Sequence, residues 1–345
     1  MSTVIVALAD KIRGQIGKSF VPTGKRINDV TEHFVRNWAW ALDERNPVYW
    51  DAGAARAAGL GEVRVPLTYV YMVARGPSYE MYGLPPGIVS LFGAQEWEFL
   101  RPLAVGDHVT AQAHIATVEE KTGKTMGPIV VVVTETSYRD RGGAPVAVQR
   151  QTGVLYESAE ARRRSAPNDP LPTVLALNET VPPAVDDRPV LGRQRHADEV
   201  RVGDAFGPYT IGPARIDQFV RFVMVGHVPP PGDDPAAVHY DPWYAARSGL
   251  RDVIDMGAWR TALFVQIADA WAGPRARVRS IVNRYGGFIY RNDMVRFAGK
   301  VVAMRAADGG AHVDVEIWND KGEGTAAVTT GTLGLYVPER EGNGR

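Results

Sequence analysis

The stretch DAGAARAAGL at residues 51–60 returns in altered form as DPWYAARSGL at residues 241–250. The first aspartate, an alanine and the final Gly-Leu coincide. Three further matches occur in the same order along both halves of the chain: Arg26-Ile27-Asn28-Asp29 with Arg215-Ile216-Asp217, Gly106-Asp107 with Asn292-Asp293, and Asp140-Arg141-Gly142 with Asp320-Lys321-Gly322. Matches that keep one order indicate a duplicated unit. The sequence therefore predicts two copies of one fold.

Each copy carries the same succession of predicted elements. An amphipathic helix places Val30, Phe34, Trp38 and Leu42 at helical spacing, and residues 216–225 repeat the pattern. A second, more apolar helix is predicted at 67–78 and at 256–271. Four tryptophans on these helices are predicted to lie in the core: Trp38, Trp40, Trp259 and Trp271. Four strands follow in each copy, at 94–101, 108–119, 128–139 and 145–156, and at 278–290, 294–304, 311–318 and 325–336.

A mostly buried helix against a curved antiparallel sheet is the hot-dog arrangement, which belongs to the α+β class. We therefore predict two tandem hot-dog domains, a double hot-dog, at residues 1–156 and 196–345. Residues 157–195 contain six prolines and many charges, and they are interpreted as a linker that crosses the surface. The two domains are expected to pair into one continuous sheet.

Composition excludes several functions. The chain has 39 basic and 39 acidic residues, which gives no support to nucleic-acid or membrane-surface binding. It has no cysteine, so disulfides, thiolate catalysis and iron–sulfur clusters are excluded. The apolar stretch before Asp10 lacks a preceding basic segment and is not interpreted as a signal peptide. No run approaches the roughly 18 apolar residues of a membrane span. We expect a soluble cytoplasmic protein.

The loops before the two Gly-Leu segments resemble the MaoC-type family of type-2 enoyl-CoA hydratases and dehydratases. The signature of that family is Gly-Asp-x-Asn-Pro-x-His, followed by an aspartate. The N-terminal copy keeps Asn46 and Pro47, but it has Tyr49 in place of the histidine and Glu44 in place of the aspartate. It resembles the non-catalytic partner subunits of acyl dehydratases. The resemblance implies that this half binds the acyl chain or the thioester tail, with Asn46 and Tyr49 as substrate-binding residues.

The C-terminal copy keeps the histidine of the signature as His239, followed by Tyr240 and Asp241. Its loop is longer than the family form and lacks the Asn-Pro pair. Counting back from His239 assigns the catalytic aspartate to Asp234, whereas counting forward from the preceding helix reaches His227 instead. The resemblance also implies a glycine that opens the central helix and donates its N–H to an enolate oxygen. Four residues complete the candidate site: Gly257 as this donor, and Tyr240, Asp255 and Met256 as substrate-binding residues.

A histidine paired with a carboxylate suits the addition of water to an α,β-unsaturated thioester. One group removes the proton of water and the other protonates the α-carbon, and the pKa of histidine lies near neutrality. A helix N-terminus supplies N–H groups and a positive dipole end to the developing enolate. The resemblance therefore implies a hydro-lyase that hydrates a 2-enoyl thioester of CoA or acyl-carrier protein, or dehydrates the 3-hydroxyacyl form.

Two alternatives to this hydro-lyase stay open. One is a repurposed hot-dog enzyme, such as an isomerase or a cyclase on a related substrate. The other is a non-catalytic thioester-binding partner of a separate active subunit. The resemblance implies no metal and no redox cofactor. We expect a homodimer, with a hetero-oligomer containing another hot-dog subunit as the alternative.

Overall fold

The computed structural model describes residues 3–22, 27–74, 83–85, 87–123, 127–157, 183–190, 192–225, 235–248 and 250–340. The N-terminal half forms α1 (Thr3–Arg13), β1 (Ser19–Phe20), α2 (Glu32–Ala41), η1 (Pro47–Tyr49), α3 (Ala52–Ala57), η2 (Leu67–Tyr69), α4 (Val70–Val73), β2 (Ile88–Phe99), β3 (Val109–Gly123), β4 (Gly127–Asp140) and β5 (Pro145–Glu157). The C-terminal half forms β6 (Val185–Asp186), β7 (Ala205–Gly212), α6 (Ile216–Met224), η4 (Pro235–His239), α7 (Pro242–Arg247), α8 (Gly257–Ala272), β8 (Arg277–Tyr285), β9 (Val295–Ala307), β10 (Gly310–Asp320) and β11 (Thr329–Pro338). Each predicted strand overlaps an observed one.

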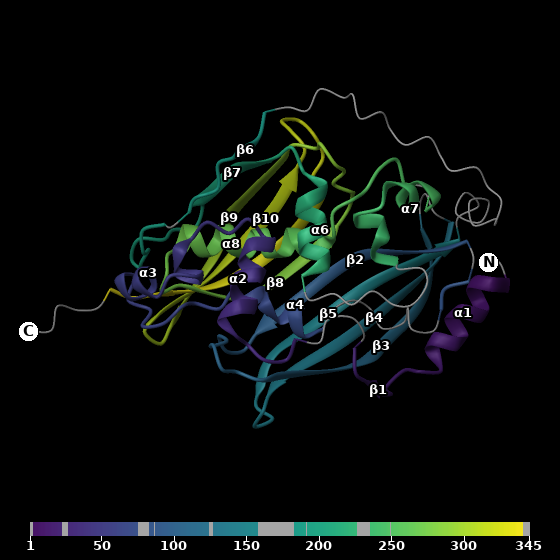
Figure 1. Ribbon diagram of the computed structural model, residues 1–345, viewed down its shortest axis with the longest axis horizontal. Helices are drawn as coiled ribbons and strands as arrows, with labels where there is room; N and C mark the ends of the chain where they lie inside the picture. The colour runs from purple at the N-terminus through teal and green to yellow at the C-terminus, as the bar shows by residue number, and fades with distance from the viewer. Residues whose placement is uncertain are drawn as a thin grey trace, which may run out of the picture.

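The strands of the described residues form one antiparallel sheet, in the order β1-β3-β4-β5-β2-β8-β11-β10-β9-β7-β6 (Figure 1). The two halves join at β2 and β8, where Ala94 to Glu98 pair with Arg284 to Ser280. Glu96 lies opposite Val282, and their separation in the chain equals that of the matched residues Gly106 and Asn292. This is the symmetry expected of a duplicated unit. The prediction of one continuous sheet is confirmed.

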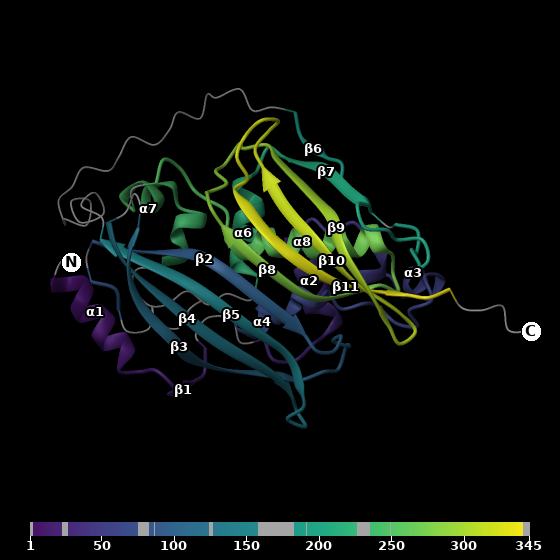
Figure 2. The same ribbon diagram turned by 180° about the vertical axis from the view of Figure 1, so that it is seen from behind.

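The helix α8 is the central helix of the C-terminal half. It is buried along most of its length, including the predicted core residues Trp259, Leu263, Ile267 and Trp271. A helix that is apolar all round must be enclosed by other elements. Figure 2 shows strands β9 to β11 lying across it. In the part of the chain that the structure describes, no helix is both long and apolar enough to cross a membrane.

The matching helix of the N-terminal half is shorter than the predicted 67–78. Residues 67–69 form the 3-10 turn η2 and residues 70–73 form α4, after which Ala74 has the extended angles φ −146° and ψ 145°. The sequence continues with Gly76-Pro77, two residues that disfavour helix. The end of the predicted range, 75–78, lies outside the described residues. This prediction was therefore wrong in the described part, where the helix stops at Val73.

Trp40 was predicted to lie in the core, and the structure corrects this. Its side chain is 61% exposed, whereas Trp38 is fully buried. Residues two apart on a helix point to nearly opposite sides, so α2 cannot bury both rings in one core. The guanidinium of Arg221 on α6 lies 4.9 Å from the centre of the Trp40 ring. Trp40 therefore belongs to a cation–π contact at the surface between the two halves.

The helix α1 covers a separate part of the sheet. Its buried residues Ile5, Leu8, Ala9 and Ile12 form a cluster with Ile88, Ile115, Val130, Val132 and Leu155. Val130 and Val132 have the same parity along β4 as Tyr138, which packs in the main core. Side chains of equal parity share one face of a strand. Hence α1 packs on the same face of the sheet as α4, nearer to the other end of the strands.

Part of the predicted linker packs on the fold. Residues 158–182 lie outside the described residues. Val185 and Asp186 form β6, which pairs with β7, and Arg188 is buried. The segment from residue 183 to 190 therefore packs on the C-terminal half. The division into residues 1–156, a linker at 157–195 and residues 196–345 stays a prediction.

Candidate active site

The repeated loops have the same backbone structure in both halves. Two backbone hydrogen bonds recur at matching positions. The first runs from Arg64 N–H to Val48 O (2.8 Å) in the N-terminal half and from Ile254 N–H to Val238 O (3.2 Å) in the C-terminal half. The second runs from Asp51 N–H to Pro47 O (2.8 Å) and from Asp241 N–H to Ala237 O (2.7 Å), in the same two halves. The matched aspartates do the same work, because the side chains of Asp51 and Asp241 each accept N–H groups at the start of a short helix, α3 or α7. Tyr49 and His239 therefore occupy equivalent positions.

His239 ends η4 and is half-buried. Its Nδ1 lies 3.0 Å from the carbonyl oxygen of Ile254. Because a carbonyl can only accept, Nδ1 carries the hydrogen, and Nε2 of the neutral ring can then accept a proton. Ile254 itself is held by its bond to Val238, in the same loop as His239. The ring thus has a fixed tautomer and a fixed direction, as a general base requires.

The N-terminus of α8 lies three residues after Ile254. Met256 is the N-cap and Gly257 is the first helical residue, as predicted for the candidate donor. The first N–H groups of a helix have no acceptor within the helix. A Cβ on Gly257 would lie 2.9 Å from Cζ of Tyr285, so the packed tyrosine ring excludes a side chain here. The catalytic role of the Gly257 N–H stays a prediction.

The carboxylate of Asp255 has partners within the protein. Arg260 donates to both of its oxygens, Nε to Oδ2 at 2.6 Å and Nη2 to Oδ1 at 2.6 Å, and the Ile289 N–H donates to Oδ1 at 3.2 Å. Asp255 and Arg260 are 3% and 2% exposed. These three donors hold the Asp255 carboxylate in place, and its predicted role in substrate binding stays a prediction.

Three predicted site residues remain: Tyr240, Asp234 and His227. Tyr240 is half-buried and follows His239 directly, and its N–H donates to Ala237 O at 3.1 Å. Asp234 and His227 lie outside the described residues. The choice between them for the acid of the site stays open.

The N-terminal loop uses its side chains differently. The hydroxyl of Tyr49 donates to Asp269 Oδ2 at 3.2 Å, and Arg64 Nη2 donates to Asp269 Oδ1 at 3.1 Å. Burial raises the pKa of Tyr49 well above its usual value, so the phenol keeps its proton. Asn46 is also buried, and its side chain accepts the Val48 N–H at 3.2 Å. Tyr49 and Asn46, predicted to bind substrate, are therefore occupied by contacts within the protein.

A pocket of about 480 Å³ lies between the loop that follows α2 and the elements β6, β7 and α6. Glu44, at the position of the family's aspartate, forms part of its wall, together with Trp40 and Arg215. Glu44 Oε1 accepts the Asn46 N–H at 2.9 Å, and burial raises the pKa of this carboxyl. His239 does not line this pocket. A catalytic role of His239 therefore stays a prediction.

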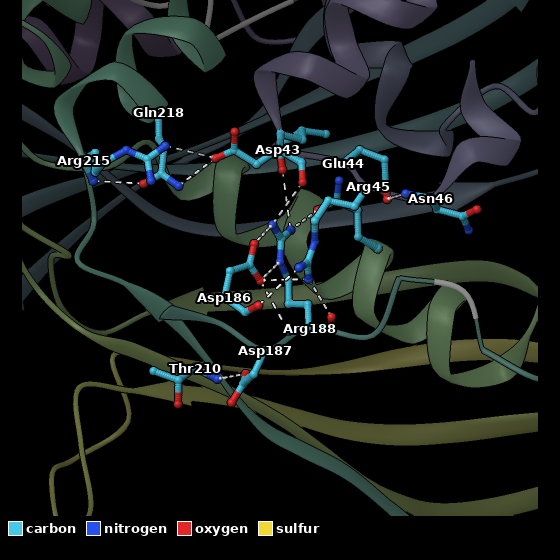
Figure 3. A network of polar contacts seen from close by, with 12 residues as sticks. Asp43, Glu44, Arg45, Asn46, Asp186, Asp187, Arg188, Thr210, Arg215 and Gln218 are labelled. Atoms are coloured by element: carbon cyan, nitrogen blue, oxygen red, sulfur yellow. Dashed lines mark hydrogen bonds and ion pairs between the residues drawn. The ribbon is translucent and has the colours of Figure 1, made fainter. Parts of the chain in front are cut away.

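Ion pairs beside this pocket connect the halves (Figure 3). Asp43 accepts from Arg221 Nη1 at 2.7 Å and from Gln218 Nε2 at 2.8 Å. Arg188 donates to the Asp43 carbonyl at 3.2 Å and to Asp186 Oδ2 at 2.7 Å. Sequence analysis did not assign any role to these residues, since partners so far apart in the chain leave no local pattern.

A buried polar network adjoins the N-terminus of α8. Thr261 Oγ1 and Tyr285 Oη lie 2.7 Å apart, where either hydroxyl can be the donor, and they lie 3.2 and 3.4 Å from Gln95 Oε1. Asn283 Nδ2 donates to Thr261 Oγ1 at 2.8 Å, and the Tyr71 hydroxyl donates to Gln95 Oε1. Sequence analysis missed this network. A signal was present in the polar residues Gln95 and Asn283, which interrupt two otherwise apolar strand faces.

Comparison with known proteins agrees with the repeated loop. Residues 15–149 match the family model described as FAS1-like, dehydratase domain region. Over 156 residues the chain is 27% identical to a "Probable enoyl-CoA hydratase alpha subunit" of Thermomonospora curvata. The aligned residues cover 41% of this chain and 49% of that subunit. Over 113 residues it is 32% identical to a UPF0336 protein of Streptomyces coelicolor. The aligned residues cover 31% of this chain and 73% of that protein.

Among solved structures, one named MaoC-like dehydratase superposes with a TM-score of 0.69 at 20% identity, over 95% of this chain and 99% of that chain. This likeness, together with the repeated loop, shows that the fold is a double hot-dog. The chain belongs to the UPF0336 family, with a FAS1-like dehydratase region in its N-terminal half. It spans about half the length of the alpha subunit that it matches.

Proposed function

We propose that this protein is a hydro-lyase of acyl thioesters. It adds water to a trans-2-enoyl thioester of CoA or acyl-carrier protein, or removes water from the 3-hydroxyacyl form. The observation that carries the proposal is the His239 ring, whose Nδ1–H is fixed on the carbonyl of Ile254, three residues before the N-terminus of α8. The names of the relatives, a dehydratase region and an enoyl-CoA hydratase subunit, support the same reaction class.

The proposed reaction uses this arrangement in three steps. His239 Nε2 takes a proton from water, whose oxygen bonds to the β-carbon. Electrons move onto the thioester oxygen, and the N–H of Gly257 and the positive end of α8 stabilise this enolate. An acid then protonates the α-carbon, and Asp234 or His227 has this role in the proposal. The N-terminal half holds the acyl chain.

Hydration of crotonyl-CoA, followed by the loss of enoyl absorbance, tests the proposal. We expect His239→Ala to lower kcat by at least about 10²-fold, the usual contribution of a general acid–base group. Tyr49→Phe is the matched control, because it changes the equivalent residue of the other loop and should leave most of the turnover per folded molecule. Equal losses in both variants would contradict the assignment of the active half.

The acid is identified by a second pair of variants. If Asp234 is the acid, Asp234→Asn removes activity and His227→Gln has a mild effect. The reverse result assigns the acid to His227.

The name "alpha subunit" of one relative favours a second candidate, a subunit that needs a separate partner. In that case the purified chain is inactive on crotonyl-CoA but regains activity when a second hot-dog protein that co-purifies with it is added.

A further inference from the structure

Four buried polar side chains lie side by side across four adjacent strands. Thr134 on β4 pairs with Gln151 on β5, Gln151 pairs with Gln95 on β2, and Gln95 pairs with Asn283 on β8. Directly paired residues point to the same face of a sheet. Gln95 and Asn283 both contact Thr261 of α8, so this is the face covered by helices. We call these four residues the polar row.

Each member of the polar row has an atom without a hydrogen-bond partner in the protein: Thr134 Oγ1, Gln151 Nε2, Gln95 Nε2 and Asn283 Oδ1. None of the four side chains is more than 3% exposed. A buried polar group without a partner destabilises the fold, and natural proteins keep few of them. Four in one row therefore form a place where a water or a ligand can supply the hydrogen bonds that the protein does not.

On the face of the sheet that the helices cover, the polar row lies between two apolar regions. On one side α4 ends at Val73, where Tyr71 packs on Trp97 with ring centres 5.0 Å apart. On the other side α1 packs on Val132 and its neighbours. Gly153 pairs with both Val132 and Phe92, so β5 presents no side chain next to Gln151 on this face. The polar row thus separates two hydrophobic clusters.

The polar row also starts at the candidate reaction site. Gln95 Oε1 lies 3.2 Å from Thr261 Oγ1 and 3.4 Å from Tyr285 Oη, and the ring of Tyr285 lies against Gly257 at the N-terminus of α8. From there the row runs away from α8 over β2, β5 and β4. Adjacent strands are about 4.8 Å apart, so a chain extended along the row passes a polar side chain about every 4.8 Å.

We propose that the polar row selects acyl thioesters whose chain carries hydroxyl or carbonyl oxygens beyond the reacting carbons. This inference rests on the proposed function. A hydroxyl on the acyl chain accepts from Gln151 Nε2 and shares a hydrogen bond with Thr134 Oγ1. A plain hydrocarbon chain leaves both atoms unpaired, and a site built for hydrogen bonds rejects a ligand that lacks them.

Binding of unreactive pantetheine thioesters tests the inference. The probes are decanoyl-pantetheine and a series of monohydroxylated forms with the hydroxyl in the outer half of the chain. Pantetheine is common to CoA and acyl-carrier protein, so the result does not depend on the carrier. We expect at least one hydroxylated form to bind about 10-fold more tightly than decanoyl-pantetheine by isothermal titration calorimetry, the effect of about one hydrogen bond.

Gln151→Leu and Thr134→Val should remove this preference, so that hydroxylated and plain chains bind these variants equally. Asn319→Leu is the matched control, because Asn319 on β10 is also a fully buried amide with unpartnered atoms but lies outside the polar row. It should keep the preference. Equal binding of all probes, or a preference that survives in Gln151→Leu, would overturn the inference.

The outcome is separable from that of the proposed function. Saturated thioesters do not react, so their binding does not depend on His239. A preference for hydroxylated chains without hydration of crotonyl-CoA would reject the hydro-lyase and keep the polar row. Hydration without the preference would do the opposite.

Discussion

Tyr49 and His239 occupy the same position in the repeated loop and have different surroundings. The Tyr49 hydroxyl is buried and donates to Asp269 of α8. His239 is half-buried, and the carbonyl of Ile254 holds its Nδ1. After the duplication, one loop thus ties the two halves together, while the other keeps an imidazole that can transfer protons. This difference follows from one residue at one position.

We predict that Tyr49→Phe destabilises the protein by about 1–3 kcal/mol, the effect of removing one partner from a buried polar group. The variant leaves Asp269 Oδ2 without the phenol that donates to it. Urea unfolding measures the change. Tyr336→Phe is the control, since the exposed Tyr336 hydroxyl donates to Asp308 O at 3.1 Å, and its loss should cost less than about 0.5 kcal/mol. Equal losses in both variants would disprove a special role for the buried bond.

Glu44 gives a prediction for pH dependence. Burial raises the pKa of Glu44 above its usual 4.5, so the folded protein binds this proton more tightly than the unfolded chain does. Stability from this group is complete below 4.5 and is lost as the pH rises through the folded-state pKa. Glu44→Gln should therefore gain stability over the wild type at neutral pH and not in acid. Urea unfolding at both pH values measures this, and a gain that is independent of pH would contradict it.

At the scale of elements, one ion pair fixes the start of α8. Arg260 binds both oxygens of Asp255 and also donates to the carbonyls of Gly287 and Val328, at 2.8 and 3.2 Å. These contacts join the N-terminus of α8 to the segments after β8 and before β11. Ile254, whose carbonyl lies 3.0 Å from His239 Nδ1, directly precedes Asp255, so the ion pair also anchors the backbone next to the contact with His239.

We predict that Arg260→Met destabilises the protein by about 3–5 kcal/mol, because it leaves the Asp255 carboxylate buried without its counter-ion. The double variant Asp255→Asn with Arg260→Met should recover a large part of this loss. Urea unfolding of the two variants gives both values. Arg251→Met is the control, since Arg251 forms an exposed pair with Asp293 at 3.4 Å and should contribute less than about 1 kcal/mol. A double variant as unstable as the single one would refute this account.

The predictability of the elements depended on the range of the interactions that form them. The spacing of Trp259, Leu263, Ile267 and Trp271 predicted α8, because a repeated local pattern determines which side of a helix is buried. The early end of α4, shortly before Gly76-Pro77, and the exposure of Trp40, two residues after the buried Trp38, also have local causes, which the helical spacing alone did not take into account. For the candidate site, the loop register indicated the positions of His239 and Gly257, and their roles stay predictions. The contact of Asp255 with Arg260 was not foreseen, because no motif of the sequence marks it.

At the scale of the whole molecule, the halves share both a sheet and a core. β2 and β8 join the two sets of strands. The Trp38 ring of the N-terminal half lies 5.3 Å from the Phe222 ring of the C-terminal half, and one hydrophobic cluster contains residues of both. The order of repeated segments predicted the shared sheet. The ion pairs of Asp43 with α6 could not be predicted, since each joins residues that are distant in the chain.

The shared core predicts that the two halves unfold as one unit. Opening either half would expose apolar residues of the other and break the β2–β8 pairing, so neither half gains by unfolding alone. In native-state hydrogen exchange with increasing urea, the slowest amides of β4 and β10 should converge on one free energy of opening. The amides of α1 serve as an internal control and should exchange earlier, because α1 packs in the smaller cluster with Val130 and Val132. Distinct limiting free energies for β4 and β10 would show that the halves are independent domains.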